Sequence, residues 1–353
     1  MLLKDCATIK GGKRLPKGQT LQGEKNSHPY IRVKDMQKRY VSLSDDYEYV
    51  PDNIFPSISR YIVNTGDVIL SIVGTVGLVA LVDKSLNNAN LTENCVKLVN
   101  IKNFLEKYVY YYLISKSGQA QIQAGIVGST QPKFPLYNIE KIEIPDVSMS
   151  EQQHIVDILG TLDDKIENLE QKIQTLIKIC ELDYKAIISG KACNACLSDI
   201  ASVESGKRPM TKESIPSNTI NIPIIGASDV MGYTDNVLFD EPILVIGRVG
   251  THGIVQPIFN RCWASDNTLV IKSKYYAYVY NILKNIDYSS INKGSTQPLI
   301  TQTDIRNTPV YTPDLNELLA FEDKHSMFLI QTYKNQIKKT KEIKNLFLQK
   351  FFG

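Results

Sequence analysis

Apolar residues recur at alternating spacings of three and four in the segment 150–189, which is the pattern of a long amphipathic helix. The stripe consists of Ile155, Leu159, Leu162, Ile166, Leu169, Ile173, Leu176 and Cys180. This spacing is typical of a coiled-coil seam, and forty helical residues would span about 60 Å. Ser148 or Ser150 can cap the start, and Gly190 lies just past the end.

A second, weaker stripe runs through the segment 316–352 and predicts another long helix. It consists of Ile330, Tyr333, Ile337, Thr340, Phe347 and Phe351. A long amphipathic helix needs a partner to bury its stripe. Because a globular segment separates the two helices, we expect them to pair in antiparallel fashion, with one domain near each end. In the alternative, each helix packs only on its own domain.

The two helices belong to an internal repeat that covers the whole chain. Its matching segments, in chain order, are Gly12-Lys13-Arg14 with Gly206-Lys207-Arg208, Gly74-Thr75-Val76-Gly77 with Gly250-Thr251-His252-Gly253, Glu93-Asn94 with Asp266-Asn267, Gly128-Ser129-Thr130-Gln131-Pro132 with Gly294-Ser295-Thr296-Gln297-Pro298, and Ile166 with Ile330. The offset between copies falls steadily along these matches, from 194 through 176, 173 and 166 to 164. Collinear matches of this kind indicate a duplicated domain-plus-helix unit.

The largest drop in offset shows that the second copy is 18 residues shorter between the positions of Asp35 and Gly74. Surface loops change length at little cost, whereas packed elements do not. We therefore expect the segment Met36–Val73, and its counterpart Val230–Val249, to hold whatever the two copies recognise differently.

Each copy alternates strand-like and helix-like runs. In the first copy the strands are expected at 30–33, 67–73, 78–82 and 95–99 with a helix at 104–115, and in the second copy at 222–225, 243–246, 253–257 and 268–271 with a helix at 275–283. The fold class is thus α+β: two tandem α/β domains, each followed by a long helix, with the helices paired as an antiparallel coiled coil of pseudo-two-fold symmetry. The expected boundaries are 1–149, 150–190, 191–315 and 316–353.

Polar and basic residues gather in the loops of both copies, and their chemistry suits phosphate contacts and base-edge hydrogen bonds. The first-copy candidates are Lys13, Arg14, Lys17, Arg32, Lys34, Lys38, Arg39, Thr75, Thr130 and Gln131. Those of the second copy are Lys207, Arg208, Lys212, Arg248, Thr251, His252, Thr296 and Gln297. Each basic residue could equally be a solvated surface charge, and the Ser-Thr-Gln loops could instead hold a domain against its helix.

Composition adds limits rather than a function. The chain has 353 residues, 43% hydrophobic residues and a formal net charge of +3, so nucleic acid is neither required nor excluded. The opening residues lack a signal-peptide pattern, and the apolar run Val68–Val82 is too short and too glycine-broken to span a bilayer. Six cysteines without such a signal indicate reduced thiols and a cytoplasmic protein.

The chain resembles the specificity (S) subunits of type I restriction–modification systems over essentially its whole length. The residues that carry the resemblance are Ile142-Glu143-Ile144-Pro145 followed by Glu151-Gln152-Gln153 and the heptad helix, the run Gly66–Gly77, and the two Gly-Ser-Thr-Gln-Pro loops. The resemblance implies two target recognition domains that each read half of a split site in double-stranded DNA, and helices that act as a ruler. It also implies that two methyltransferase (M) subunits dock on the helices and that restriction (R) subunits join through them.

The resemblance implies no catalysis and no cofactor or metal in this chain; S-adenosylmethionine, ATP and Mg would belong to the partner subunits. The distal helix departs from the family pattern, since Asn316-Glu317-Leu318 stands where Glu151-Gln152-Gln153 leads one to expect acidic and glutamine residues. A loose nuclease pattern, Pro145-Asp146 with Glu170-Gln171-Lys172 and Pro313-Asp314 with Glu322-Asp323-Lys324, and the lone pair Cys193 and Cys196 remain weak signals. The alternative function is a coiled-coil adaptor that binds proteins only.

Overall fold

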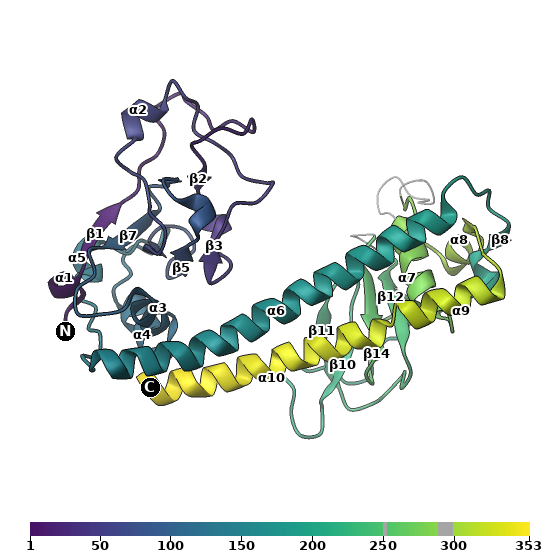
Figure 1. Ribbon diagram of the computed structural model, residues 1–353. Helices are drawn as coiled ribbons and strands as arrows, with labels where there is room; N and C mark the ends of the chain where they lie inside the picture. The colour runs from purple at the N-terminus through teal and green to yellow at the C-terminus, as the bar shows by residue number, and fades with distance from the viewer. Residues whose placement is uncertain (250–252, 289–298) are drawn as a thin grey trace. The chain divides into compact units, whose positions relative to one another are not determined.

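The computed structural model describes residues 1–249, 253–288 and 299–353, and it divides into two units (Figure 1). Unit 1 comprises Met1–Glu167 and Lys338–Gly353, and unit 2 comprises Asn168–Ile337. Each unit therefore holds one copy of the repeat together with parts of both long helical segments. The mixed strands and helices confirm the expected fold class.

The globular domain of unit 1 is built on a five-stranded sheet of order β1-β7-β4-β5-β3. The strands are β1 (Thr8–Gly11), β2 (Tyr30–Ile31), β3 (Tyr40–Val41), β4 (Val68–Ser71), β5 (Val79–Val82), β6 (Asn90–Leu91) and β7 (Cys95–Val99). The helices are α1 (Leu3–Cys6), α2 (Phe55–Ile58), α3 (Glu106–Ile114), α4 (Lys116–Ala124) and α5 (Leu136–Ile139), with 3₁₀ turns η1 (Val33–Asp35) and η2 (Lys84–Leu86).

The globular domain of unit 2 is built on a four-stranded sheet of order β13-β12-β15-β9 and a three-stranded sheet of order β11-β10-β14. The strands are β8 (Ala195–Cys196), β9 (Ser202–Ser205), β10 (Ile222–Ile225), β11 (Val230–Thr234), β12 (Ile243–Gly247), β13 (Val255–Ile258), β14 (Trp263–Ala264), β15 (Thr268–Lys272) and β16 (Pro309–Val310). The remaining elements are η3 (Leu197–Asp199), α7 (Tyr276–Asn285) and α8 (Gln302–Arg306).

The two main sheets have the same strand register. In unit 1, β1 pairs with β7 so that Thr8 faces Val99, and in unit 2, β9 pairs with β15 so that Ser202 faces Lys272. The second pair is the first shifted by 194 and 173 residues, which are the repeat offsets at those points. The small parallel pairs agree as well, because β2 and β6 match β10 and β14 under the same two shifts. These strand pairs therefore correspond between the two copies, so the duplication found in the sequence is also present in the fold.

The copies differ where the lengths differ. The first copy uses its extra residues for β3, which pairs in parallel with β5, and for the short helix α2. The second copy instead has β11, which forms a hairpin with β10 and carries a register shift at Ile224 and Ile225. The polar edge strands β1 and β9 escaped prediction because their short sequences lack an apolar alternation.

Alternate residues of the central strands enter two different cores in unit 1. Val68 and Leu70 of β4 pack in a cluster with α3, the start of α6 and the chain's last turns, whereas Ile69 packs in a second cluster on the other face. This period of two is what a strand covered on both faces requires. The sheet is thus a buried scaffold, and its loops are what remains for contact with other molecules.

The long helical segments are α6 (Met149–Ile188), α9 (Leu315–Lys324) and α10 (Met327–Phe352). In unit 1, His154 contacts Phe351 and Asp163 binds Lys344 at 2.7 Å, so α6 and α10 run antiparallel there. In unit 2, Asp183 of α6 accepts from Lys324 at 2.7 Å. No helix of the described residues is long and apolar enough to cross a membrane.

The predicted helix seam is largely buried. Ile155, Leu159, Ile166, Leu169, Ile173, Ile330 and Ile337 are buried, whereas Leu162, Leu176 and Tyr333 are half-buried. Near the C-terminus Leu348 and Phe352 are buried instead of Phe347 and Phe351, because the ring of Phe352 packs edge-on against Tyr108 and Tyr112. The C-terminal helical segment is interrupted at His325, where the backbone leaves the helical region. The imidazole ring of His325 is hydrogen-bonded to the carboxylate of Asp183 at 2.8 Å.

Gln152 attaches the first domain to the start of α6. Its side chain is fully buried, its amide nitrogen donates to the carbonyls of Asn103 and Val147, and its carbonyl accepts from the amide of Leu105, the N-cap of α3. The neighbouring Gln153 is exposed, and its side chain donates to Asp157 on its own helix at 2.7 Å. In the sequence Glu151-Gln152-Gln153, the middle residue therefore stabilises the fold.

Replacing Gln152 with Ala should lower the free energy of unfolding by about 2–4 kcal/mol, because buried backbone groups lose their partners. The matched change Gln153→Ala should cost less than about 0.5 kcal/mol. Urea denaturation of the two variants followed by circular dichroism measures both values. Equal stability of the two variants would contradict this attachment.

Candidate DNA interface

The recurring polar motifs of the first copy meet at one edge of its sheet. Strands β1 and β4 end at this edge, at Gly11 and Ser71, and β5 and β7 begin there. The loops that leave from it are therefore those of Gly12–Lys17, Gly74–Gly77 and Glu93–Asn94. A backbone bridge between Val73 and Lys133 brings the Gly-Ser-Thr-Gln-Pro loop to the same place. We call this region the loop edge.

The second copy has the same loop edge. The backbone of Arg248 donates to the carbonyl of Asn267 at 3.0 Å, as Ile72 does to Asn94 at 2.8 Å, and Val249 bridges Leu299 as Val73 bridges Lys133. Thr251, His252, Thr296 and Gln297 lie outside the described residues. The described residues Val249 and Leu299, which flank them in the sequence, pair with each other at this edge.

A close approach between two backbone segments fixes the position of the Gly-Lys-Arg loop in both copies. A side chain at Gly12 would begin 2.1 Å from the carbonyl oxygen of Thr92, and one at Gly206 would begin 2.1 Å from that of Ser265. The backbone amide of the next residue is also hydrogen-bonded in each copy. That of Lys13 donates to the carbonyl of Leu91 at 2.8 Å, and that of Lys207 donates to the carbonyl of Ala264 at 2.9 Å. Glycine is needed here because only its bare backbone fits this approach.

An aromatic side chain completes the attachment of each basic loop. The hydroxyl of Tyr30 donates to the carbonyl of Lys13 at 2.9 Å, and the indole of Trp263 donates to that of Lys207 at 2.6 Å. Burial raises the pKa of Tyr30 to about 12, so its hydroxyl stays a donor at neutral pH. The backbone is held while the basic side chains point to solvent.

Most candidates at the loop edge are exposed. These are Lys13, Arg14, Lys17, Thr75, Thr130 and Gln131 in the first copy and Lys207, Arg208 and Lys212 in the second. Arg14 pairs with Glu93 at 2.9 Å while remaining 73% exposed, which leaves its guanidinium accessible. Arg208 and Lys212 line a hollow of about 460 Å³ together with Asp266 and Asn267. Amide and carboxylate groups beside cations suit both base-edge and phosphate contacts.

Other basic candidates lie away from this exposed set. Arg32 is 16% exposed and pairs with Asp35 and Glu48, so it stabilises its own loop. Arg39 is 9% exposed and binds carboxylates of α6. Lys34 is exposed within η1, and Arg248 is half-buried with its backbone in the loop edge.

Met210 lies in the second basic loop, between the cations Arg208 and Lys212, and is 96% exposed. The loop is anchored on both sides of it, by Lys207 and by Thr211, whose hydroxyl lies 2.8 Å from that of Thr234. Met231 lines the neighbouring hollows. An apolar side chain displayed between cations can contact thymine methyl groups. No periodicity or charge marks such a residue, so the sequence offered no signal for it.

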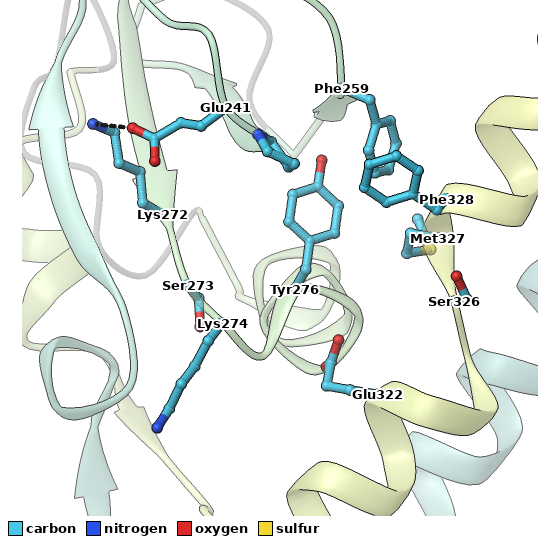
Figure 2. Close-up of a pocket in the computed structure, with 11 residues that line it drawn as sticks. Glu241, Phe259, Lys272, Ser273, Lys274, Tyr276, Glu322, Ser326, Met327 and Phe328 are labelled. Carbon is cyan, nitrogen blue, oxygen red and sulfur yellow. Dashed lines mark ion pairs between the residues drawn. The ribbon is translucent and has the colours of Figure 1, made fainter.

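A separate pocket of about 540 Å³ lies in unit 2 between the first turn of α7 and the break between α9 and α10 (Figure 2). Phe259, Tyr276 and Phe328 line it, and Glu241 pairs with Lys272 at its rim at 2.9 Å. Glu322 accepts hydrogen bonds from the amides of Ala277 and Tyr278, while burial raises the pKa of Glu322. This glutamate caps a helix.

The two carboxylates of the second-copy nuclease pattern therefore serve as helix caps. Asp314 accepts from the amide of Glu317 at the start of α9, and Glu322 is occupied by the amides of α7. Within the described ranges no three His, Cys, Asp or Glu side chains are grouped to hold a metal ion. Each of the two domains holds a basic loop edge in a fixed position. This arrangement defines a class of protein, a two-domain scaffold that reads nucleic acid.

Comparisons with known proteins agree with this class. The sequence profile of the type I restriction modification DNA specificity domain matches residues 1–178 and 193–346. The type I restriction enzyme MjaIX specificity subunit of Methanocaldococcus jannaschii is 24% identical over 362 residues, covering 88% of this chain and 82% of that protein. The type I restriction enzyme EcoR124I/EcoR124II specificity subunit of Escherichia coli is 24% identical over 181 residues, covering 50% and 43%.

A solved structure shows the same fold. The crystal structure of the type I restriction–modification S subunit from M. genitalium superposes with a TM-score of 0.66 at 15% identity and covers 100% of this chain and 95% of that one.

The chain belongs to the family of type I restriction–modification DNA specificity proteins, because the profile spans both copies of the repeat. It is a DNA sequence-specificity subunit and catalyses no reaction itself. It acts with DNA and with other subunits of such a system, and the cofactors belong to those subunits. These findings support the DNA-reading interpretation over the protein-only adaptor.

Replacing Gly12 with Ala should displace the basic loop, lowering the free energy of unfolding by about 1–3 kcal/mol and weakening DNA binding. Gly11 is the matched control, since a side chain there meets no atom within 4 Å. Gly11→Ala should leave stability within about 0.5 kcal/mol of the parent and leave affinity unchanged. Denaturation curves and fluorescence-anisotropy titrations with target duplex measure the two quantities. If both variants behave alike, close packing at Gly12 does not hold the loop.

Proposed function

We propose that each globular domain reads one half of a bipartite DNA target through its loop edge, while the paired helices set the distance between the halves. The observation that carries this proposal is the convergence of four polar motifs on one sheet edge in the first copy. In the second copy the described counterparts, Gly206-Lys207-Arg208 and Asp266-Asn267, lie at the equivalent edge beside Val249 and Leu299. Two modules that bind one DNA molecule add their binding free energies, so a split site is read more selectively than either half.

Within each loop edge we assign the contacts by chemistry. Lys13, Arg14 and Lys17, with Lys207, Arg208 and Lys212, contact phosphates, since flexible cations on a fixed backbone suit a regular array of charges. Thr75, Thr130 and Gln131, with their counterparts Thr251, Thr296 and Gln297, are assigned to base edges, as is His252, which stands at the position of Val76. Lys34 and Arg248 flank these groups. Arg32 and Arg39 are assigned no DNA contact, because carboxylates of the chain already pair with them.

The two half-sites should differ in sequence. The segment between η1 and β4 holds β3 and α2 in the first copy, whereas the shorter equivalent stretch of the second copy holds β11, which forms a hairpin with β10. The domain boundaries 1–149 and 191–315, with the helices between and after them, describe the two reading modules.

The helices are proposed to dock two M subunits, with R subunits joining through them. Ile343 and Leu346 of α10 are 44% and 66% exposed in unit 1, and Ile179 and Leu182 of α6 are 42% and 53% exposed in unit 2. Exposed aliphatic residues on a helix favour a protein partner. Such an assembly modifies chromosomal DNA, so we place it in the cytoplasm.

Methylation sequencing tests the bipartite target directly. The chain is co-expressed with an M subunit in a host that lacks other methyltransferases, and methylated adenines or cytosines are mapped. We expect one motif of two unlike half-sites separated by a spacer of fixed length. Methylation confined to a single continuous motif, or no selective methylation by an assembled complex, would contradict the proposal.

Removing two phosphate contacts should flatten the salt dependence of binding. For Lys13→Ala with Lys207→Ala, the slope of log K against log salt should become shallower by roughly 1.8, because each contact contributes about 0.9. Lys84 is the control, since it is exposed but follows β5 at the opposite end of the sheet. Lys84→Ala should keep the parental slope in titrations between 50 and 200 mM salt, which is about the range over which counterion release is measured. An unchanged slope in the double variant would remove both lysines from the interface.

A further inference from the structure

Arg39 joins the first globular domain to the middle of α6 within unit 1. Its Nε donates to Oε1 of Glu167 at 3.0 Å and its Nη2 to Oε2 of the same carboxylate at 2.9 Å, a two-pronged contact. Nη2 also donates to Asp164, one turn earlier on the helix. The Arg39 side chain is 9% exposed, and its guanidinium carbon lies 4.9 Å from the centroid of the Tyr40 ring. A bidentate, largely covered pair of this kind is more directional and less screened than a surface ion pair.

The donor of this contact comes from the segment that only the first copy has at full length. The backbone of Arg39 is itself held in the sheet, because its carbonyl accepts from the amide of Leu81 at 2.8 Å. The following residue, Tyr40, begins β3 and pairs with Leu81 in parallel. The guanidinium therefore projects from the edge of the rigid sheet rather than from a free loop.

The acceptors are also absent from the second copy. The repeat offset of 164 in the helices places Phe328 and Gln331 at the positions of Asp164 and Glu167. Phe328 is 59% exposed and packs on Phe259 with ring centroids 5.1 Å apart, in the pocket of Figure 2. Donor and acceptors thus occur together in one copy and are both missing from the other.

The hollows beside these residues confirm that the two places are equivalent. Glu106 and Asp164 line a hollow of about 510 Å³ in unit 1, and their counterparts at offsets of 170 and 164, Tyr276 and Phe328, line the pocket of about 540 Å³ in unit 2. The same site between domain and helix is polar and bridged by arginine in one copy and aromatic in the other. The bridge is therefore an addition to the common scaffold.

The bridge is the second attachment of this domain to α6. Gln152 is the first, and Glu167 follows it by fifteen residues, which is about 22 Å along a helix. A domain held near one point of a rod can rock about that point, whereas a second attachment far along the rod fixes its angle. Rocking of a reading domain changes where its loop edge meets the DNA.

We propose that Arg39 is a positioning residue that sets which spacer length the complex accepts, by fixing the angle of the first recognition domain on α6. This inference rests on the proposed bipartite reading. Arg39 touches no base; it acts through Asp164 and Glu167, and its loss leaves the loop edge intact. The half-site sequences therefore stay the same while the tolerance for spacer length widens.

The test uses the complete methyltransferase complex and duplexes that carry the mapped half-sites with the native spacer or with one base pair more or fewer. For Arg39→Ala we expect methyl-transfer rates on the altered spacers, relative to the native spacer, to rise at least tenfold over wild type. Arg39→Lys keeps the charge but not the two-pronged geometry, so its relative rate on the altered spacers should lie between those of wild type and of Arg39→Ala. Lys165→Ala removes an exposed charge beside Asp164 and should keep the wild-type ratio.

Two helix-side variants keep the test decisive if Arg39→Ala fails to fold. Asp164→Asn and Glu167→Gln remove the acceptor charges from an exposed face of α6, and their combination should widen spacer tolerance as Arg39→Ala does. Wild-type spacer selectivity in folded variants that lack the bridge would overturn the inference and leave bipartite reading intact. A wild-type complex without a bipartite motif would instead contradict the proposed function.

Discussion

Burial of the apolar stripe on α6 is the constraint on which the rest of the structure depends. A 40-residue amphipathic helix is not stable alone in water, because its stripe must be covered. In unit 1 the cover is the globular domain together with the last turns of α10. Ile155 and Leu159 of α6 share one core with Leu3 at the start of the chain and with Phe352 near its end. Within unit 1 the globular domain, the start of α6 and the end of α10 therefore share one core, and the loop edge is attached to that core.

A shared core explains what the duplication kept and what it changed. Strand registers agree pair by pair between the copies, because a shift of one residue would turn every buried side chain outward. The close approaches at Gly12 and Gly206 are kept for a similar reason, since the backbone leaves no room for a side chain. The largest length change, 18 residues, falls in the stretch after η1, where the added residues of the first copy extend the sheet edge with β3. A scaffold of this kind can change its target while its shape is preserved.

Arginine and lysine residues that look alike in the sequence have different roles in the fold. Lys13 and Lys207 are displayed by a held backbone and have open side chains, which suits contact with a charged polymer. Arg32 and Arg39 are satisfied by carboxylates of their own unit. A cation that is already paired would have to break that pairing to bind phosphate, so these two serve the position and shape of the domain.

The repeat, the two long helices, the fold class and the glycine-lysine-arginine loops could be read from the sequence, because periodicity and recurrence are properties of the chain itself. The break at His325 could not be, since it depends on the partner Asp183 across the helix pair. Nor could the convergence of four motifs on one loop edge, which follows from strand order. Only the tertiary structure decided that Arg39 binds Glu167 of α6, because these residues lie 128 positions apart and no local pattern relates them.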